Sequence, residues 1–183
     1  MKKAIVLLAN GCEEVEAITQ IDFLRRGNVE VAAASIHDTT TIQGAHGITI
    51  MADCLLKDLA ADSYDMVVLP GGGVGMQNLK ASAPVAALLK SFAAAGKWVC
   101  AICASPSVLG GLGLVQGKKY TCYPGFEPEM TGGQATGAKV VVDGNIITSK
   151  GPGTSLDFAL QMIEVLNGKE LADKTASDAQ YIR

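Results

Sequence analysis

A cysteine at position 103 stands where a short apolar segment runs into a turn of small residues. The segment Trp98 to Ile102 predicts a buried strand, and Pro106 to Leu114 predicts a helix that begins at its proline. A side chain at such a junction projects away from the sheet, and small neighbours such as Ala104 let the turn close. The N–H groups and dipole at a helix start favour a thiolate. We therefore expect Cys103 to be a nucleophile with a lowered pKa; a buried apolar cysteine is the alternative.

The same stretch places Cys100 three residues before Cys103, which is the spacing of a redox cysteine pair. In such pairs the first cysteine leads the helix, whereas Cys100 falls inside the expected strand. Residues three apart on a strand point to opposite faces of the sheet, so a disulfide between these two is the weaker interpretation. The chain has five cysteines, and this odd number indicates free thiols in a reducing, cytoplasmic compartment.

A glycine-rich turn follows the apolar segment Asp65 to Leu69. Gly71 and Gly72 open it, but Met76 stands where the dinucleotide fingerprint needs a glycine, and no Lys–Ser/Thr pair makes a P-loop. The turn is therefore a weak signal for a nucleotide. Its backbone N–H groups, with that of Ala104, are expected to hold an oxyanion. A plain tight turn is the alternative.

Carboxylates gather at the start of the helix expected over Glu13 to Arg26. Glu14 and Glu16 lie in its first turn, where negative charge complements the helix dipole. That account suffices for most of them, and helical spacing alone does not bury Glu16. If Glu16 faces inward, burial raises its pKa and it carries a proton at neutral pH.

Strands alternate with helices along the whole chain. Expected strands cover 3–9, 29–35, 65–69 and 98–102, with hairpins over 42–50 and 139–149; expected helices cover 13–26, 84–95, 106–114 and a stretch from 152 to 166. This order predicts an α/β fold with a mostly parallel sheet between helices. Ligands bind beyond the carboxyl ends of such strands. The loops 10–16, 70–75 and 103–106 should therefore meet there.

Composition limits the possible functions. The 183 residues fit a single domain over 1–183, and the net charge of −3 lacks the basic footprint of a nucleic-acid binder. We find no run of about 18 apolar residues, so no membrane helix is expected. With two histidines in the chain, a Cys/His zinc cluster is not expected, and we predict no metal.

Taken together, these residues resemble the ThiJ/PfpI superfamily, and most closely its Parkinson-disease protein (DJ-type) branch. The similarity covers essentially the whole chain, and the order and spacing of its segments are specific. The segments are Gly11-Cys12-Glu13-Glu14-Val15-Glu16, Asp22 with Arg25-Arg26-Gly27, Tyr64-Asp65 with Val67-Val68-Leu69-Pro70-Gly71-Gly72, Ala101-Ile102-Cys103-Ala104, and Thr148-Ser149-Lys150-Gly151-Pro152-Gly153-Thr154-Ser155.

The resemblance implies a flavodoxin-like three-layer sandwich that forms a homodimer, with the first helix at or near the interface. It implies that Cys103 is the nucleophile, that Glu16 hydrogen-bonds its sulfur, and that the region of Gly71 and Gly72 supplies oxyanion donors. The branch is associated with cofactor-free glyoxalase and deglycase activity, with oxidation sensing and with chaperone activity.

Two departures from the family patterns affect the expected chemistry. In the protease-like branch a histidine follows the cysteine, whereas Ala104 follows it here, which disfavours a peptidase. In the DJ-type pattern a histidine lies near the cysteine, in a segment where this chain has Tyr123. A tyrosine has a pKa near 10 and does not serve as a base at neutral pH. Proton transfer would fall to Glu16, water or another group.

His46 and Pro152 are further expected neighbours of the site. His46 lies in the hairpin that, in the resembling branch, carries an arginine near the active site of the other subunit. We expect His46 to approach Cys103 across the dimer and to stabilise its thiolate; an exposed turn histidine is the alternative. Pro152 lies in the last of the resembling segments.

Three functions remain open at this point. The first is an enzyme without cofactor that adds the Cys103 thiolate to a small reactive dicarbonyl, or acts on its adducts, with Glu16 moving the proton. The second is an oxidative-stress sensor or holdase chaperone whose Cys103 is oxidised. The third and weakest is a cysteine peptidase or amidase.

Overall fold

The chain is built around a central sheet in this computed structural model, which describes residues 1–182. Within them the sheet has seven strands in the order β10-β11-β7-β6-β1-β2-β5. All pair in parallel except β10, which is antiparallel to β11. The strands are β1 (Lys3–Leu8), β2 (Glu30–Ser35), β5 (Cys54–Leu55), β6 (Met66–Leu69), β7 (Trp98–Ile102), β10 (Val140–Asp143) and β11 (Ile146–Ser149).

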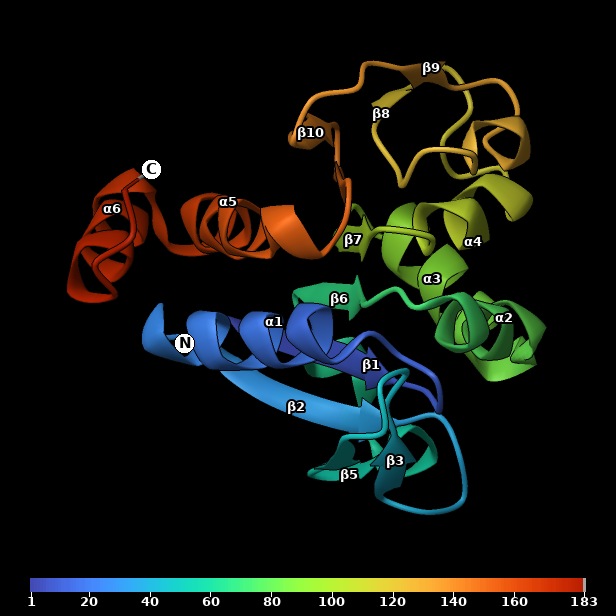
Figure 1. Cartoon of the computed structure of the whole chain (residues 1–183), viewed down its shortest axis with the longest axis horizontal. Coiled ribbons are helices and arrows are strands. Elements are labelled where there is room, and N and C mark those ends of the chain that lie inside the picture. The colour runs from blue at the N-terminus through green and yellow to red at the C-terminus, as the bar shows by residue number, and fades with distance from the viewer. Residues whose placement is uncertain (183) are drawn as a thin grey trace.

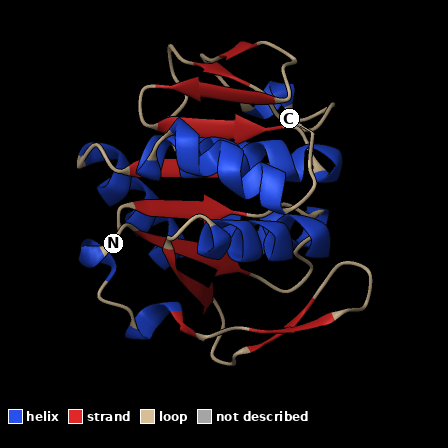
Figure 2. Ribbon diagram, turned by 90° about the vertical axis from the view of Figure 1, so that its left-hand side faces the viewer, coloured by secondary structure: helices blue, strands red, loops and turns tan. Residues whose placement is uncertain are grey.

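Helices cover both faces of the sheet (Figure 1). They are α1 (Glu14–Arg26), α2 (Gly73–Ala81), α3 (Ala83–Ala94), α4 (Pro106–Gly111), α5 (Ser155–Asn167) and α6 (Lys169–Asp178). Figure 2 shows helices in front of the row of strands. On that side α1 packs on α5, and α5 packs on α6. Helices α2, α3 and α4 lie on the other side. The predicted flavodoxin-like sandwich is confirmed.

Smaller elements decorate this core. The hairpin pairs β3 (Thr41–Gln43) with β4 (Thr49–Met51), and β8 (Lys119–Tyr120) pairs with β9 (Gln134–Ala135). Short 3-10 turns cover Leu56–Asp58, Ala61–Ser63, Glu127–Glu129 and Pro152–Thr154. None of the described helices has the length and apolarity needed to cross a membrane.

The central strands explain the position of the site. Residues 4–8 of β1 and all of β6 are fully buried, because parallel strands covered on both faces are apolar on both sides. From β1 the chain moves to β2 on one side, whereas β6 and β7 lie on the other. The loops after β1 and β6 therefore meet at the carboxyl ends of the strands, where the Glu13 N–H donates to the Gly71 carbonyl at 3.1 Å and the Gly75 N–H to the Gly11 carbonyl at 3.0 Å.

The structure departs from the sequence-based expectations at two helix ends and in one additional helix. The loop expected over 70–75 is shorter, because Gly72 turns the chain at φ 89° and α2 begins at Gly73. The helix expected to reach Leu114 ends at Gly111, after two consecutive glycines. Helix α6 is not among the expected helices, since the residues it buries are small: Ala172, Thr175 and Ala176.

Two adjacent glycines provide a test of this turn. A Cβ at Gly72 would lie 2.3 Å from the Gly11 carbonyl oxygen, whereas a Cβ at Gly73 meets nothing within 4 Å. We expect Gly72→Ala to lower the free energy of unfolding by at least about 2 kcal/mol, and Gly73→Ala to change it by less than about 0.5 kcal/mol. Urea unfolding of both variants measures this, and equal effects would contradict the steric account.

Candidate active site

Cys103 follows the last residue of β7 in a left-handed backbone conformation, with φ 66°. This region is uncommon for a residue with a side chain and costs energy. Two hydrogen bonds hold the conformation: the Cys103 N–H donates to the Ser149 carbonyl at 3.0 Å, and the Tyr123 N–H donates to the Cys103 carbonyl at 2.8 Å. The predicted elbow therefore exists, and its cysteine is 8% exposed.

Glu16 lies beside this cysteine and is completely buried. The Glu13 side chain caps α1 by accepting the Glu16 N–H at 2.7 Å, which fixes the first helical turn. The Glu16 carboxyl accepts the Gly71 N–H through Oε2 at 2.7 Å and lies within hydrogen-bonding reach of the Cys103 thiol. A Cβ at Gly71 would lie 2.6 Å from both Cys103 Cβ and Glu16 Oε2, so only glycine lets the two side chains meet.

Two backbone amides face the sulfur. The N–H groups of Gly72 and Ala104 interact with the Cys103 sulfur and lower its pKa. The third amide expected to hold an oxyanion, that of Gly71, is occupied by Glu16. Ser105, which the sequence analysis did not single out, ties the elbow to the glycine turn, because its hydroxyl donates to the Pro70 carbonyl at 2.6 Å.

The expected lowering of the Cys103 pKa is wrong for the resting pair. Burial, followed by the charge of Glu16 and its hydrogen bond, raises the pKa of Cys103 to about 12, against the opposing amides of Gly72 and Ala104. Helix α4, which follows, has six residues and gives too weak a field to offset burial. Burial also raises the pKa of Glu16 to about 7.

These two shifts describe one coupled pair. Two negative charges cannot share a buried site near neutral pH, so Cys103 and Glu16 together retain one proton over a wide pH range. In that state the proton lies on sulfur or on the carboxyl oxygen, and its transfer to Glu16 produces the thiolate without changing the net charge. One proton transfer therefore produces both the nucleophile, the Cys103 thiolate, and the acid, the protonated Glu16.

A groove of about 400 Å³ has Tyr123 in its lining but not Cys103 itself. Tyr123, which is half exposed, and Pro152 both line it, and the Tyr123 ring lies against Gly151. The other lining residues are Pro124, Lys139, Lys150, Gly151, Gly153 and Thr154. The backbone of Tyr123 links the groove to the elbow, because its N–H donates to the Cys103 carbonyl. It provides room for a small molecule.

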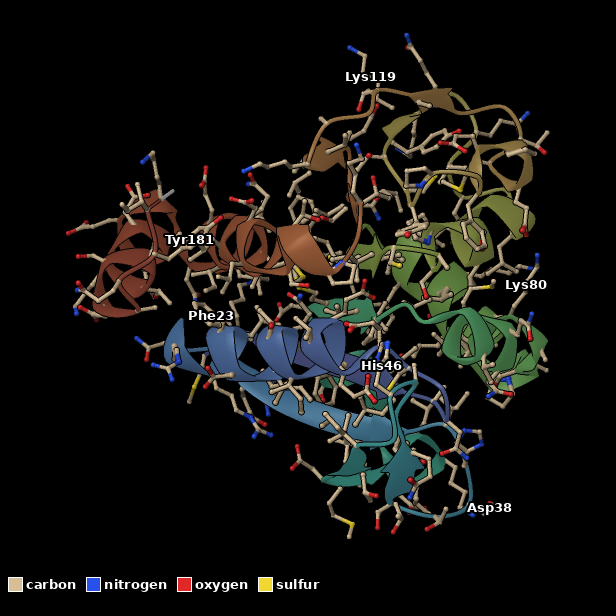
Figure 3. All side chains as sticks on the ribbon, viewed as in Figure 1. Phe23, Asp38, His46, Lys80, Lys119 and Tyr181 are labelled. Atoms are coloured by element: carbon tan, nitrogen blue, oxygen red, sulfur yellow. The ribbon has the colours of Figure 1, made fainter. Side chains whose placement is uncertain are left out.

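His46 does not contact Cys103 within the chain. Its Nδ1 pairs with Glu14 Oε2 at 2.7 Å, and its backbone N–H donates to Glu14 Oε1 at 2.6 Å, which joins the β3–β4 hairpin to the first turn of α1 (Figure 3). Burial would raise the pKa of Glu14, but the hydrogen bonds from His46 and from the Ile48 N–H lower it to about 2. The hydrogen bond to Glu14 raises the pKa of His46.

Glu13, Glu14 and His46 also bring ligand atoms within 4.8 Å of one another, which is the spacing of a metal site. Glu14 and His46 already satisfy each other as an ion pair, and Glu13 caps α1. The cluster is thus accounted for by local structure. The five cysteines, all within residues 1–182, are free thiols.

An α/β sandwich with a cysteine on a strained strand–helix elbow, beside a buried glutamate and two backbone amides that act on the sulfur, defines a class of cysteine-centred proteins. The family model described as "DJ-1/PfpI family" matches residues 2–165. The chain belongs to the DJ-1/PfpI family.

Similar proteins come from several different organisms. The chain is 40% identical over 177 residues to protein dj-1beta of Drosophila melanogaster, with 96% of this chain and 95% of that protein covered. It is 37% identical to the glutathione-independent glyoxalase DJR-1.2 of Caenorhabditis elegans, with 92% and 91% covered. Among solved structures, oxidized Toxoplasma gondii DJ-1 superposes with a TM-score of 0.96 at 39% identity over the full length of both chains.

Some relatives are longer than this chain. Protein DJ-1 homolog B of Arabidopsis thaliana is 39% identical over 173 residues, which is 93% of this chain and 40% of that protein. For homolog A the corresponding shares are 96% and 46%. The chain thus spans less than half the length of these plant relatives.

The buried carboxyl should make stability depend on pH. The folded-state pKa of Glu16 is raised from 4.5 to about 7, so its stabilising contribution is complete below pH 4.5 and is lost as pH rises through 7. We expect Glu16→Gln, which never ionises, to gain up to about 3 kcal/mol over the wild type between pH 4.5 and pH 8. Urea unfolding at both pH values measures it. The exposed Glu170→Gln is the control, and a difference that does not change with pH would contradict the assignment.

Proposed function

We propose that the protein is a cofactor-free cysteine enzyme acting on small reactive dicarbonyls, such as methylglyoxal, or on their adducts. The observation that carries this proposal is the completely buried Glu16 carboxyl beside the Cys103 thiol, an arrangement in which the two groups share one proton. The name of the Caenorhabditis elegans relative, a glutathione-independent glyoxalase, supports the same chemistry.

The first step forms a carbon–sulfur bond. Proton transfer from sulfur to Glu16 frees the thiolate, which attacks the aldehyde carbon. Negative charge develops on the former carbonyl oxygen, where the amides of Gly72 and Ala104 are available to stabilise it. Glu16 then returns its proton to this oxygen, which gives a neutral hemithioacetal on Cys103.

The following steps need no external oxidant. Glu16, again a carboxylate, removes the hydrogen of the carbon bonded to sulfur as a proton, and the electron pair forms an enediolate. The hydroxyl proton of that carbon then passes to the oxygen of its neighbour, and Glu16 keeps the carbon-derived proton for the next step. Reprotonation at the neighbouring carbon gives a thioester, so one carbon is oxidised and the other reduced. Water hydrolyses the thioester, which releases lactate from methylglyoxal and restores the Cys103 thiol. Tyr123, in place of a histidine, leaves Glu16 as the proton carrier.

Oxidation sensing is the second candidate, and the same amides favour it. A sulfinate on Cys103 would accept hydrogen bonds from Gly72, Ala104 and a protonated Glu16. The buried position of the sulfur restricts access to small oxidants.

Incubation with methylglyoxal tests the proposed activity. We expect lactate to accumulate with the wild type, to be absent with Cys103→Ala, and to form at least about 100-fold more slowly with Glu16→Gln. Cys54→Ala is the control, because Cys54 lies on β5 at the edge of the sheet, and this variant should behave as the wild type. Lactate formation that survives in Cys103→Ala would contradict the proposal.

The same assay has an expected pH profile. The reactive form holds one proton between Cys103 and Glu16, and it appears as the pair loses its first proton at a pKa of about 7. The value of kcat/KM should therefore rise about tenfold per pH unit below 7 and level off above it. A profile that rises only near the pKa of a free thiol would contradict the coupled pair.

We further propose that two copies associate through α1 and the β3–β4 hairpin. Val15 and Ile18 on α1 are 53% and 46% exposed, and Ile48 and Met51 of the hairpin are 57% and 67% exposed. The Glu14–His46 ion pair joins the two elements, so these side chains belong to connected surfaces. Exposed apolar surface of this kind favours a second copy as its cover, in line with the homodimer implied by the family resemblance.

This interface gives His46 a testable role. In the dimer, the imidazole should approach the partner's site and stabilise its thiolate. We expect a dimer by sedimentation at micromolar concentration, and His46→Ala should raise the apparent Cys103 pKa and slow methylglyoxal consumption. His37→Asn is the control, because His37 accepts the Asn10 N–H through Nε2 within its own chain. A monomer, or an unchanged rate in His46→Ala, would overturn the proposal.

A further inference from the structure

Three buried polar atoms between α1 and the start of α5 lack a hydrogen-bond partner among residues 1–182. They are Oε1 of Glu16, Oε1 of Gln20 and Oγ of Ser155. The first two residues are completely buried and Ser155 is 2% exposed. Leaving such an atom unpaired costs free energy, so native proteins satisfy it, commonly with an ordered water.

The three atoms belong to residues that lie together. Gln20 Nε2 donates to the Ser155 carbonyl oxygen at 3.2 Å, which joins α1 to α5. Glu16 and Gln20 are four residues apart on α1, so their side chains lie one above the other on the same face. That face packs on α5, as Figure 1 shows for the two helices. We call these three residues the α1–α5 seam.

The remaining groups at the carboxyl are already engaged. Glu16 Oε2 accepts the Gly71 N–H, and the carboxyl also meets the Cys103 thiol. Oε1 has no hydrogen-bond partner among the described residues. Gln20 Oε1 is only an acceptor, so a molecule that satisfies both oxygens must donate twice, and water does this while accepting from the Ser155 hydroxyl.

We propose that the α1–α5 seam holds a buried water that donates to Glu16 Oε1 and Gln20 Oε1 and accepts from Ser155 Oγ. Gln20 and Ser155 thus act as positioning residues for Glu16, through this water. The proposal rests on the proposed function only in giving Glu16 the task of carrying a proton; the water follows from the seam alone.

The water has a definite electrostatic consequence. A water that donates to a carboxylate stabilises its ionised form, so it limits the rise in pKa that burial imposes on Glu16. The titratable groups that act on this carboxyl are Cys103 on the elbow and Glu13 on α1. The glycine turn contributes the Gly71 amide, and α5 contributes the neutral Ser155. The seam therefore keeps Glu16 within reach of neutral pH without adding a charge.

Infrared titration of the Glu16 carboxyl tests the seam directly. The carbonyl band of the protonated acid is assigned by its loss in Glu16→Gln, and its disappearance with pH gives the pKa. We expect Gln20→Leu and Ser155→Ala each to raise that pKa, with Gln20→Leu shifting it by about one unit. Ser155→Thr, which keeps the hydroxyl, should titrate as the wild type. Thr19→Val, a half-buried neighbour on α1, is the matched control.

A crystal structure of the wild type supplies the second measurement and does not depend on any variant folding. Density for a water within about 3 Å of all three atoms supports the proposal. A direct hydrogen bond between Gln20 Oε1 and the Ser155 hydroxyl overturns it, as does an unchanged Glu16 titration in Gln20→Leu. If the titration shifts but methylglyoxal gives no lactate, the seam stands and the proposed activity fails. If lactate forms but the Glu16 pKa is unchanged in Gln20→Leu, the proposed activity stands and the seam proposal fails.

Discussion

Contact between the buried Glu16 carboxyl and the Cys103 sulfur is the interaction on which the rest of the site depends. Two ionisable groups are brought together out of water, so neither titrates independently and the pair holds a shared proton. Gly71 permits the approach because it has no side chain, and its amide orients one carboxyl oxygen. The chemistry available to the protein follows from where that one proton lies.

The scaffold sustains this contact through backbone connections from several parts of the chain. Glu13 sets the start of α1, the Ser105 hydroxyl holds the glycine turn, and Ser149 and Tyr123 hold the two sides of the elbow. All of these meet at the carboxyl ends of the central strands, where the loops after β1 and β6 hydrogen-bond to each other. A fold with buried, fully covered parallel strands is stiff enough to keep such an arrangement in place.

Much of this architecture was predictable from local pattern. Alternating apolar runs and helical spacing gave the layers, and the junction around Cys103 predicted the elbow. The burial of the site residues was not predictable, because helical spacing alone did not place Glu16 in the interior. The pKa of the Cys103 thiol is raised and not lowered, because desolvation outweighs the dipole of a helix of six residues. Helix α6 was not predicted because its buried residues are small and give no apolar periodicity. The Glu14–His46 pair joins residues 32 apart, which no local pattern reveals.

The left-handed backbone of Cys103 has a consequence for how this sequence can change over time. Only glycine would be relaxed at φ 66°, so the site sets activity against stability at a single position. Replacement by glycine would relieve the strain and remove the sulfur in one step, leaving a more robust protein without a nucleophile. A lineage released from selection for the thiol would therefore drift readily toward inactive, well-folded descendants, whereas keeping the cysteine requires that its function be needed continuously.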